Sequence, residues 1–188
     1  MSQEPEDTAV AELINDRAIV WNPQHGMRLY SEGYFGQPVG IRKPKSAEFD
    51  KPLELSLIEC AYLTRAGKLS VWNPNSGQVL TETDLLSLGT AKSDEFPDRL
   101  LVYSQLRELG YVVRPGLKFG TDFAVYEHGP GIDHAPFLIH VIPQKKGVMP
   151  LDIVRAGRLA TSVKKKFIVA TVKENGEIAY YSFQWHRP

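Results

Sequence analysis

Residues 116–137 read GLKFGTDFAVYEHGPGIDHAPF, and residues 158–167 read RLATSVKKKF. In the first stretch an apolar run over 123–128 leads into a loop rich in glycine and proline, and a second apolar run follows over 137–142. Nearly continuous apolar runs are typical of strands that are covered on both faces. In the second stretch a helical pattern changes into another strand. The two stretches therefore predict a mixed sheet flanked by helices.

The surrounding residues extend this sheet. A helix is expected up to Gly110, because apolar residues recur at helical spacing from Val102 to Leu109. The remaining expected elements are strands over 111–113, 166–172 and 177–185 and a helix over 150–163 that has Pro150 near its first turn. Asn175-Gly176 lies between the last two strands, and this pair is typical of two-residue hairpin turns.

The first half of the chain predicts a smaller α+β unit. Its expected elements are strands over 18–22 and 68–72, a helix over 53–67 with Leu55, Ile58 and Tyr62 on one face, and a second helix capped by Thr81 and Asp84. Residues 92–98, KSDEFPD, are polar and contain a proline, which is typical of a linker. The sequence therefore predicts an α+β fold with two domains, 1–92 and 93–188.

Composition limits the class of protein. Among 188 residues, 22 Lys and Arg balance 22 Asp and Glu, which argues against a polyanion binder that acts through bulk charge. Basic residues nevertheless cluster at 42–45, 144–146 and 164–166. Cys60 is the only cysteine, so an internal disulfide is excluded and we expect it to pack in a core. The acidic N-terminus lacks a signal-peptide pattern and no apolar run approaches about 20 residues, so a cytoplasmic, membrane-free location is expected.

Three side chains near the sheet can carry acid–base chemistry together. Tyr126 ends an apolar run, His134 follows the loop, and Lys165 lies where helix becomes strand. A phenol can take a proton from a ribose 2′-OH, an imidazole can protonate a leaving 5′-oxygen, and an ammonium can hold charge on phosphorus. Because tyrosine has an ordinary pKa of ~10, we expect a nearby cation, with Lys165 as the candidate, to lower the pKa of Tyr126.

Other interpretations of these residues stay open. Tyr126 can be a packed core tyrosine, His134 a loop residue, and Lys164, Lys165 and Lys166 solvated charges. Strand alternation places Lys165 on the side opposite to Lys164 and Lys166, so one of the two sets faces away from solvent.

Other histidine and aspartate residues compete for a place in this site. His128 can line the same loop, and His140 is expected to be a packed or cross-strand residue. Asp122, Asp133 and Asp152 allow a metal-dependent nuclease as an alternative. A zinc site is excluded by the single cysteine and the scattered histidines.

The segments GLKFGTDF (116–123), Tyr126, HAPF (134–137) and RLATSVKKKF (158–167) together resemble the signature of the tRNA-intron endonucleases. The resemblance covers essentially all of 93–188 and extends more loosely to the first half. It implies a restriction-endonuclease-like catalytic domain that cuts precursor tRNA at bulge–helix–bulge junctions. It also implies 2′,3′-cyclic phosphate and 5′-hydroxyl ends, with no metal or other cofactor in the chemistry.

The same resemblance assigns roles to residues of this chain. Tyr126 corresponds to the general base, His134 to the general acid and Lys165 to the stabilising lysine. Arg158 and Trp185 correspond to residues that clamp an unpaired nucleotide, which an arginine plane and an indole can do by stacking. Thr161 stands where many relatives have histidine, so the end of this helix can differ from theirs in how it contacts RNA or supports Lys165.

Assembly is also implied by the resemblance. Two scissile bonds require two active sites at a fixed separation, so a chain with one site must oligomerise. Glu174 and Glu177 match an acidic loop that enters a neighbouring subunit, while Arg42, Lys43 and Lys45 lie in an insertion typical of catalytic subunits that contact RNA. We therefore expect a heterotetramer with a separate structural subunit, and a homotetramer is the alternative. A non-catalytic RNA-binding subunit on the same fold is a further alternative.

Overall fold

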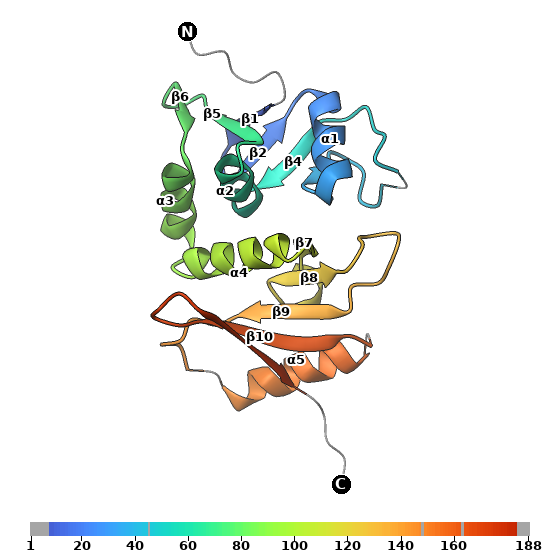
Figure 1. Ribbon diagram of the computed structural model, residues 1–188, viewed down its shortest axis with the longest axis vertical. Coiled ribbons are helices and arrows are strands. Elements are labelled where there is room, and N and C mark those ends of the chain that lie inside the picture. Colours follow the sequence, from blue (N-terminus) through green and yellow to red (C-terminus); the bar gives the residue numbers. More distant parts are fainter. Residues whose placement is uncertain (1–7, 45, 148, 163, 184–188) are drawn as a thin grey trace. The chain divides into compact units, whose positions relative to one another are not determined.

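The computed structural model describes residues 8–44, 46–147, 149–162 and 164–183. The chain divides into two compact units, Met1–Phe96 and Pro97–Pro188, and each unit combines a mixed sheet with helices (Figure 1). The predicted α+β fold is therefore confirmed.

A six-stranded sheet forms the centre of the first unit. Its strands are β1 (Ala9–Ile14), β2 (Arg17–Val20), β3 (Gln37–Pro38), β4 (Leu53–Ser56), β5 (Leu69–Asn73) and β6 (Gln78–Leu80). They are ordered β3-β4-β2-β1-β5-β6, and only the β1–β5 pair is parallel among them. The helices of this unit are α1 (Pro23–Gly33), α2 (Leu57–Arg65) and α3 (Glu82–Lys92).

One face of this sheet is the core of the first unit. Along β1, Ala9, Ala11 and Leu13 are buried, whereas Val10 and Ile14 point outward. Helices α1 and α2 pack on the buried face. The approach of α1 is close, because a Cβ added to Gly26 would lie 3.0 Å from the Cβ of Leu53.

The predicted helix over 53–67 is wrong in its first turn. Leu53–Ser56 forms strand β4, and α2 begins at Leu57, because Ser56 and Glu59 form a reciprocal capping box that starts a helix. Consequently Leu57, Cys60 and Ala61 form the buried face of α2, and the predicted face of Leu55, Ile58 and Tyr62 does not exist as one face.

The carboxylate of Glu59 also ties α2 to the segment after α1. It is 5% exposed and accepts hydrogen bonds from the backbone N–H groups of Gly36 and Ser56 at 2.8 and 2.9 Å. Cys60 is fully buried, as predicted, and burial raises the pKa of its thiol far above the ordinary range. The predicted cap of Thr81 and Asp84 at the start of α3 is confirmed.

The second unit holds a five-stranded sheet. Its strands are β7 (Val112–Pro115), β8 (Phe123–Tyr126), β9 (Phe137–Val141), β10 (Lys166–Val172) and β11 (Ile178–Phe183), ordered β11-β10-β9-β8-β7. Strands β9 and β10 are parallel and are joined through α5 (Pro150–Ser162), while the other neighbours are antiparallel. Helices α4 (Phe96–Glu108) and α5 lie on opposite sides of this sheet (Figure 1).

The final hairpin differs from its prediction by one residue. Its connection spans three residues, Glu174 to Gly176, because Lys173 accepts from Gly176 and donates to Glu177 at 2.9 and 2.8 Å. A two-residue type I′ turn would need positive φ at both central residues. Here Gly176 has φ +82° whereas Asn175 does not have a positive φ, so the longer turn forms.

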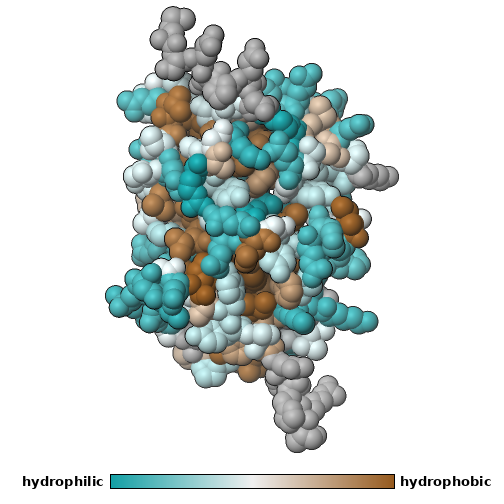
Figure 2. Space-filling model, viewed as in Figure 1, coloured by the Kyte–Doolittle hydropathy of each residue, from teal (hydrophilic) through white to brown (hydrophobic). Residues whose placement is uncertain are grey.

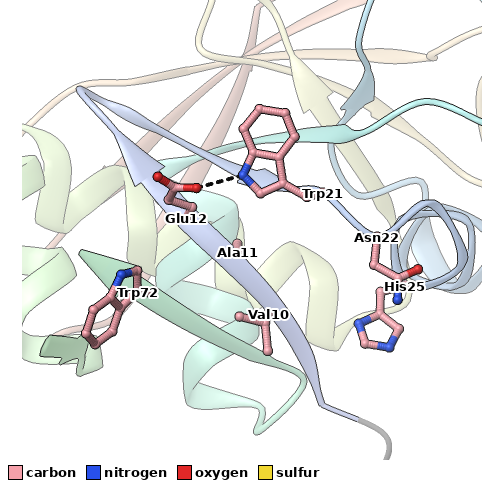
Figure 3. A pocket seen from close by; sticks show the side chains of 7 residues that line it. All are labelled: Val10, Ala11, Glu12, Trp21, Asn22, His25 and Trp72. Atoms are coloured by element: carbon pink, nitrogen blue, oxygen red, sulfur yellow. Dashed lines mark hydrogen bonds between the residues drawn. The ribbon is translucent and has the colours of Figure 1, made fainter. Parts of the chain in front are cut away.

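The surface mixes hydrophobic and hydrophilic residues on the face shown in Figure 2. A shallow hollow of about 370 Å³ in the first unit is lined by residues that include Trp21 and Glu12, and Trp21 donates its indole N–H to Glu12 at 2.8 Å (Figure 3). None of the helices in the described ranges has the length and apolar character needed to cross a membrane.

Candidate active site

Tyr126 is the last residue of β8 and pairs in register with Val112 of β7. Its half-buried ring packs against a core cluster that includes Ala124, Leu138 and Phe167. Tyr126 thus packs on the sheet at the strand end, where the following loop begins. This placement suits a phenol that must meet a substrate from outside.

The prediction that Lys165 lowers the pKa of Tyr126 is wrong. Burial raises the pKa of Tyr126 above its ordinary value, the cation that opposes this shift is Arg114, and Asp133 adds to the rise. Arg114 of β7 pairs in register with Ala124 of β8, just as Val112 pairs with Tyr126. Arg114 is therefore the diagonal neighbour of Tyr126 on the same face of the sheet. Lys165 is not among the groups that shift the pKa of Tyr126.

The loop after Tyr126 is organised by one carboxylate, that of Asp133. Its oxygens accept from the backbone N–H groups of Glu127, His128 and Gly129 at 3.1, 3.0 and 3.0 Å. Burial alone would raise the pKa of Asp133, but these three donors and the His128 imidazole hold the pKa below its ordinary value. Asp133 therefore joins the two ends of the loop over residues 127–134, and it holds the backbone next to His134 in place.

Lys165 meets the other end of this loop. Its ammonium donates to the backbone carbonyl of Ala135, next to His134, and lies 5.7 Å from the centre of the Phe119 ring. Burial lowers the pKa of Lys165, and Asp133 partly opposes this shift. Lys164 and Lys166 are exposed and Lys165 is part-buried, but strand alternation is not the cause, because β10 begins at Lys166 and Lys164 has φ +54°.

The three predicted catalytic residues thus lie around one loop. Tyr126 precedes it, His134 is an exposed residue at its end, and Lys165 holds the carbonyl that follows. The carboxylate of Asp133 raises the pKa of both Tyr126 and Lys165. Such a grouping of a phenol, an imidazole and an ammonium can support acid–base attack on a phosphodiester.

The competing acidic and histidine residues form a separate cluster. Asp122 accepts from His140 Nδ1 at 2.7 Å and from the backbone N–H of Val141 at 2.8 Å, and it lies 2.8 Å from Arg99 Nε. His140 is therefore a cross-strand partner, as expected. Among the described residues no three His, Cys, Asp or Glu side chains gather as a metal-binding group. The Asp152 side chain lies outside the described residues.

Each half of the chain matches the model of a known protein family. The family model of the tRNA intron endonuclease catalytic C-terminal domain matches residues 96–180, and that of the N-terminal domain matches residues 9–86. The chain belongs to the tRNA intron endonuclease family. The prediction that it is an enzyme, an endonuclease, is thereby confirmed.

Relatives in this family match the chain almost from end to end. The tRNA-splicing endonuclease of Hyperthermus butylicus is 44% identical over 179 residues, which are 95% of this chain and 98% of that protein. That of Pyrobaculum arsenaticum is 45% identical over 173 residues, or 90% of this chain and 94% of that protein. That of Saccharolobus solfataricus is 38% identical over 175 residues, or 92% and 96%.

The predicted RNA contacts of this family member lie in two regions. Arg158 is exposed on α5, and Thr161, one turn later, is exposed and donates its hydroxyl to Gly157 at 2.8 Å. Arg42 and Lys43 are exposed in a stretch without regular structure. Lys45 and Trp185 lie outside the described residues.

The predicted acidic loop is the turn between β10 and β11. Glu174 lies 3.5 Å from Lys145, and Glu177 accepts from Lys173 at 3.0 Å. Hydrogen bonds from Asn175 and Lys173 lower the pKa of Glu177. Both carboxylates are exposed, so they can meet a partner, but each already has a lysine of its own chain beside it.

The structure adds two site residues that sequence reasoning missed. Arg114 lies two residues after Val112, the register partner of Tyr126, and therefore on the same face of the sheet as Tyr126. The sequence offers Asp133 only as a metal ligand, whereas in the structure it accepts three backbone hydrogen bonds. An aspartate preceded by glycines and a proline is a signal for a loop that bonds its own backbone.

Proposed function

We propose that this chain cleaves precursor tRNA at bulge–helix–bulge exon–intron junctions by a metal-independent mechanism. The observation that supports it best is the meeting of the Tyr126 strand end, the His134 loop and Lys165, inside the segment that matches the catalytic domain of the family. The relatives are named tRNA-splicing endonucleases, which supports this class of substrate.

In the proposed reaction the ribose 2′-oxygen attacks the adjacent phosphorus. Tyr126 takes the 2′-OH proton as the P–O2′ bond forms, and His134 gives a proton to the 5′-oxygen as the P–O5′ bond breaks. Lys165 stabilises the extra negative charge on the phosphoryl oxygens. The products are a 2′,3′-cyclic phosphate and a 5′-hydroxyl, so atoms and protons balance without water entering.

The raised pKa of Tyr126 has a kinetic consequence for this mechanism. At neutral pH the phenol is protonated, so only a small fraction is ready to act as a base. We therefore expect a bell-shaped pH–rate profile, because the reaction needs both a deprotonated base and a protonated acid. Arg114 limits the rise in pKa, and Arg114→Ala is expected to slow cleavage further by raising the pKa of Tyr126.

The remaining predicted residues are proposed to bind substrate and subunits. Arg158 and Trp185 clamp an unpaired nucleotide, and Arg42, Lys43 and Lys45 contact the RNA backbone. The loop of Glu174 and Glu177 enters a neighbouring subunit. The proposed assembly is a heterotetramer with a separate structural subunit, and a homotetramer of this chain is the alternative.

Cleavage of a bulge–helix–bulge RNA in EDTA tests this proposal, with the chain alone and with a candidate structural subunit. Product ends are assigned by whether the 3′ end resists phosphatase until acid opens a cyclic phosphate. His134→Ala and Lys165→Ala are expected to bind RNA but lose cleavage by orders of magnitude, whereas Lys164→Ala serves as the matched neighbour and keeps it.

The possible outcomes separate the alternatives. Cleavage that needs the partner supports the heterotetramer, and cleavage by the chain alone supports the homotetramer. Cleavage seen only when magnesium is added would overturn the proposed mechanism in favour of a metal-dependent nuclease. RNA binding without cleavage under every condition would make the chain a non-catalytic subunit.

A further inference from the structure

A short turn between β7 and β8 carries one aromatic side chain to the candidate active site. We call residues 116–121 the Phe119 turn, and it contains the 3₁₀ helix η1 (Leu117–Phe119). Backbone hydrogen bonds close it, since Gly116 donates to Asp122 at 2.8 Å and Phe119 donates to Gly116 at 2.7 Å. The turn therefore has a fixed shape at the start of β8.

Thr121 holds the Phe119 turn against β8. It is 5% exposed, and its hydroxyl donates to the carbonyl of Gly116 at 3.4 Å. The space beside this hydroxyl is so limited that a Cβ added to Gly116 would lie 2.5 Å from its oxygen. Close contacts within the turn thus set the position of the Phe119 backbone.

Of the three side chains of η1, that of Phe119 alone packs toward the sheet. Leu117 is 84% exposed and Lys118 is exposed, whereas Phe119 is partly buried against a core cluster. Tyr126 packs against the same cluster. The buried members of this cluster are Ala124, Ala135, Leu138, Ile142, Phe167 and Val169. One cluster therefore supports both the ring of Phe119 and the proposed general base.

The ammonium of Lys165 contacts both this ring and the end of the catalytic loop. It donates to the carbonyl of Ala135, a residue that is 2% exposed, and its nitrogen lies 5.7 Å from the centre of the Phe119 ring. A cation within about 6 Å of a ring centre is attracted by the electrons of the ring face. Lysine has a flexible stem of four carbons, so two contacts from different parts of the chain restrict where its ammonium can lie.

An aromatic ring is a suitable neighbour for a cation that must act on an anion. A carboxylate in direct contact would offset the charge of the ammonium and would repel a phosphate. A ring face attracts the ammonium but has no net charge, so the positive charge stays available to phosphoryl oxygens. The ring of Phe119 can therefore hold Lys165 in place without weakening its effect on a substrate.

We propose that Phe119 is a positioning residue of the active site, whose ring holds the Lys165 ammonium against the carbonyl of Ala135. Because Ala135 directly follows His134, this contact ties the ammonium to the backbone beside the proposed general acid. The inference rests on the proposed function, in which Lys165 stabilises charge on the phosphoryl oxygens. Phe119 touches no reacting atom in this scheme, so it acts on kcat through Lys165.

Fluorination of the ring tests this inference, because it changes the charge of the ring face and nearly preserves its shape. Phe119 is replaced by phenylalanines that carry one, two or three ring fluorines, and single-turnover cleavage of a bulge–helix–bulge RNA is measured. Each fluorine weakens the attraction for a cation. The rate is therefore expected to fall stepwise, by about two- to fivefold with three fluorines, while RNA binding is kept.

Phe137 provides a matched control in the same unit. Its ring lies 6.0 Å from the ammonium of Lys166, an exposed lysine that the proposed mechanism does not use. The same fluorinated residues at Phe137 are expected to leave the cleavage rate unchanged. A ring that only fills the core would give the same result at Phe119 as at Phe137.

A second measurement does not depend on cleavage. The pKa of the Lys165 ammonium is followed by NMR of a protein with isotope-labelled lysine, and its signal is assigned from its loss in Lys165→Arg. Because the ring face favours the charged form, fluorination of Phe119 is expected to lower this pKa stepwise. Fluorination of Phe137 is expected to leave it unchanged.

The outcomes separate this inference from the proposed function. A cleavage rate and a Lys165 pKa that both fall with fluorination of Phe119 support the inference. A rate or a pKa that stays constant across the series would overturn it. A wild-type chain that cleaves no RNA under any condition refutes the proposed function, whereas the titration still decides whether Phe119 holds Lys165.

Discussion

Replacing Asp133 by alanine probes how the catalytic loop is held. The carboxylate accepts three backbone hydrogen bonds, at 3.1, 3.0 and 3.0 Å, from the residues that follow Tyr126. It also precedes His134 directly in the chain. Without it, the loop keeps its length but loses the contact that joins its two ends, so Tyr126 and His134 are no longer fixed relative to each other.

The expected size of the effect follows from these bonds. A hydrogen bond to a charged acceptor contributes about 1.5–3 kcal/mol when buried, and water replaces part of this where the group is accessible. The Asp133 side chain is 23% exposed, so we assign about 2–4 kcal/mol to the three bonds together. A loop that loses this ordering should reduce single-turnover cleavage by about 10- to 100-fold, mainly in kcat.

The pH dependence distinguishes positioning from a general loss of structure. Asp133 raises the pKa of both Tyr126 and Lys165, so its removal lowers both values. The rising limb of the pH–rate profile should therefore move to lower pH in Asp133→Ala. Asp133→Asn keeps an acceptor oxygen without the charge, so it should recover part of the rate but show the same shift.

The assay is single-turnover cleavage of a bulge–helix–bulge RNA between pH 5 and 10, together with binding of an uncleavable 2′-deoxy analogue. Glu127→Ala removes a carboxylate from the same loop and is the matched control, since Glu127 is exposed and does not shift the pKa of Tyr126. An Asp133→Ala enzyme with the wild-type rate and pH profile would refute the reasoning.

Two further predictions concern stability. Glu59→Ala leaves the N–H groups of Gly36 and Ser56 without their acceptor and should lower the free energy of unfolding by about 2–4 kcal/mol in urea titrations. Glu82 has a side chain that is 39% exposed and lies 3.9 Å from Arg65, so Glu82→Ala should change this free energy by less than about 1 kcal/mol. Burial would raise the pKa of Asp122, but its hydrogen bonds and its arginine neighbour hold that pKa below the ordinary value. The stabilisation from Asp122 is therefore present above about pH 4 and lost as pH falls through its folded pKa, so acid should destabilise wild type more than Asp122→Asn.

Strong local patterns were sufficient to predict the second unit. Strands β8, β9 and β10 follow from apolar runs that stand out from the polar loops around them. The capped start of α3 follows from Thr81 and Asp84, whose bonds are local and need no knowledge of the rest of the chain. Such caps can be predicted from the sequence because their partner groups lie within one helical turn of each other.

The missed elements depend on contacts that are distant in sequence. Strand β1 was not predicted, because two of its three inward residues are alanines and its outward residues mix valine and isoleucine with glutamate, so the run has little apolar contrast between its faces. Residues Leu53–Ser56 were assigned to a helix, although their alternation fits a strand once β2 and β3 lie beside them. Arg114 becomes a neighbour of Tyr126 only through the register of β7 with β8.

The charge distribution explains how a chain of zero net charge can suit an anionic substrate. Arg114 is the cation that acts on Tyr126, Lys165 lies at the other end of the loop, and Asp133 is the carboxylate that acts on both Tyr126 and Lys165. That carboxylate is already committed to three backbone donors, so it offers little repulsion to a phosphate placed outside the loop. Burial raises the pKa of the Tyr126 phenol, which favours its neutral form, and Arg114 limits that rise. Local pairing of charges, and not their sum over the chain, therefore decides which ligand the site can accept.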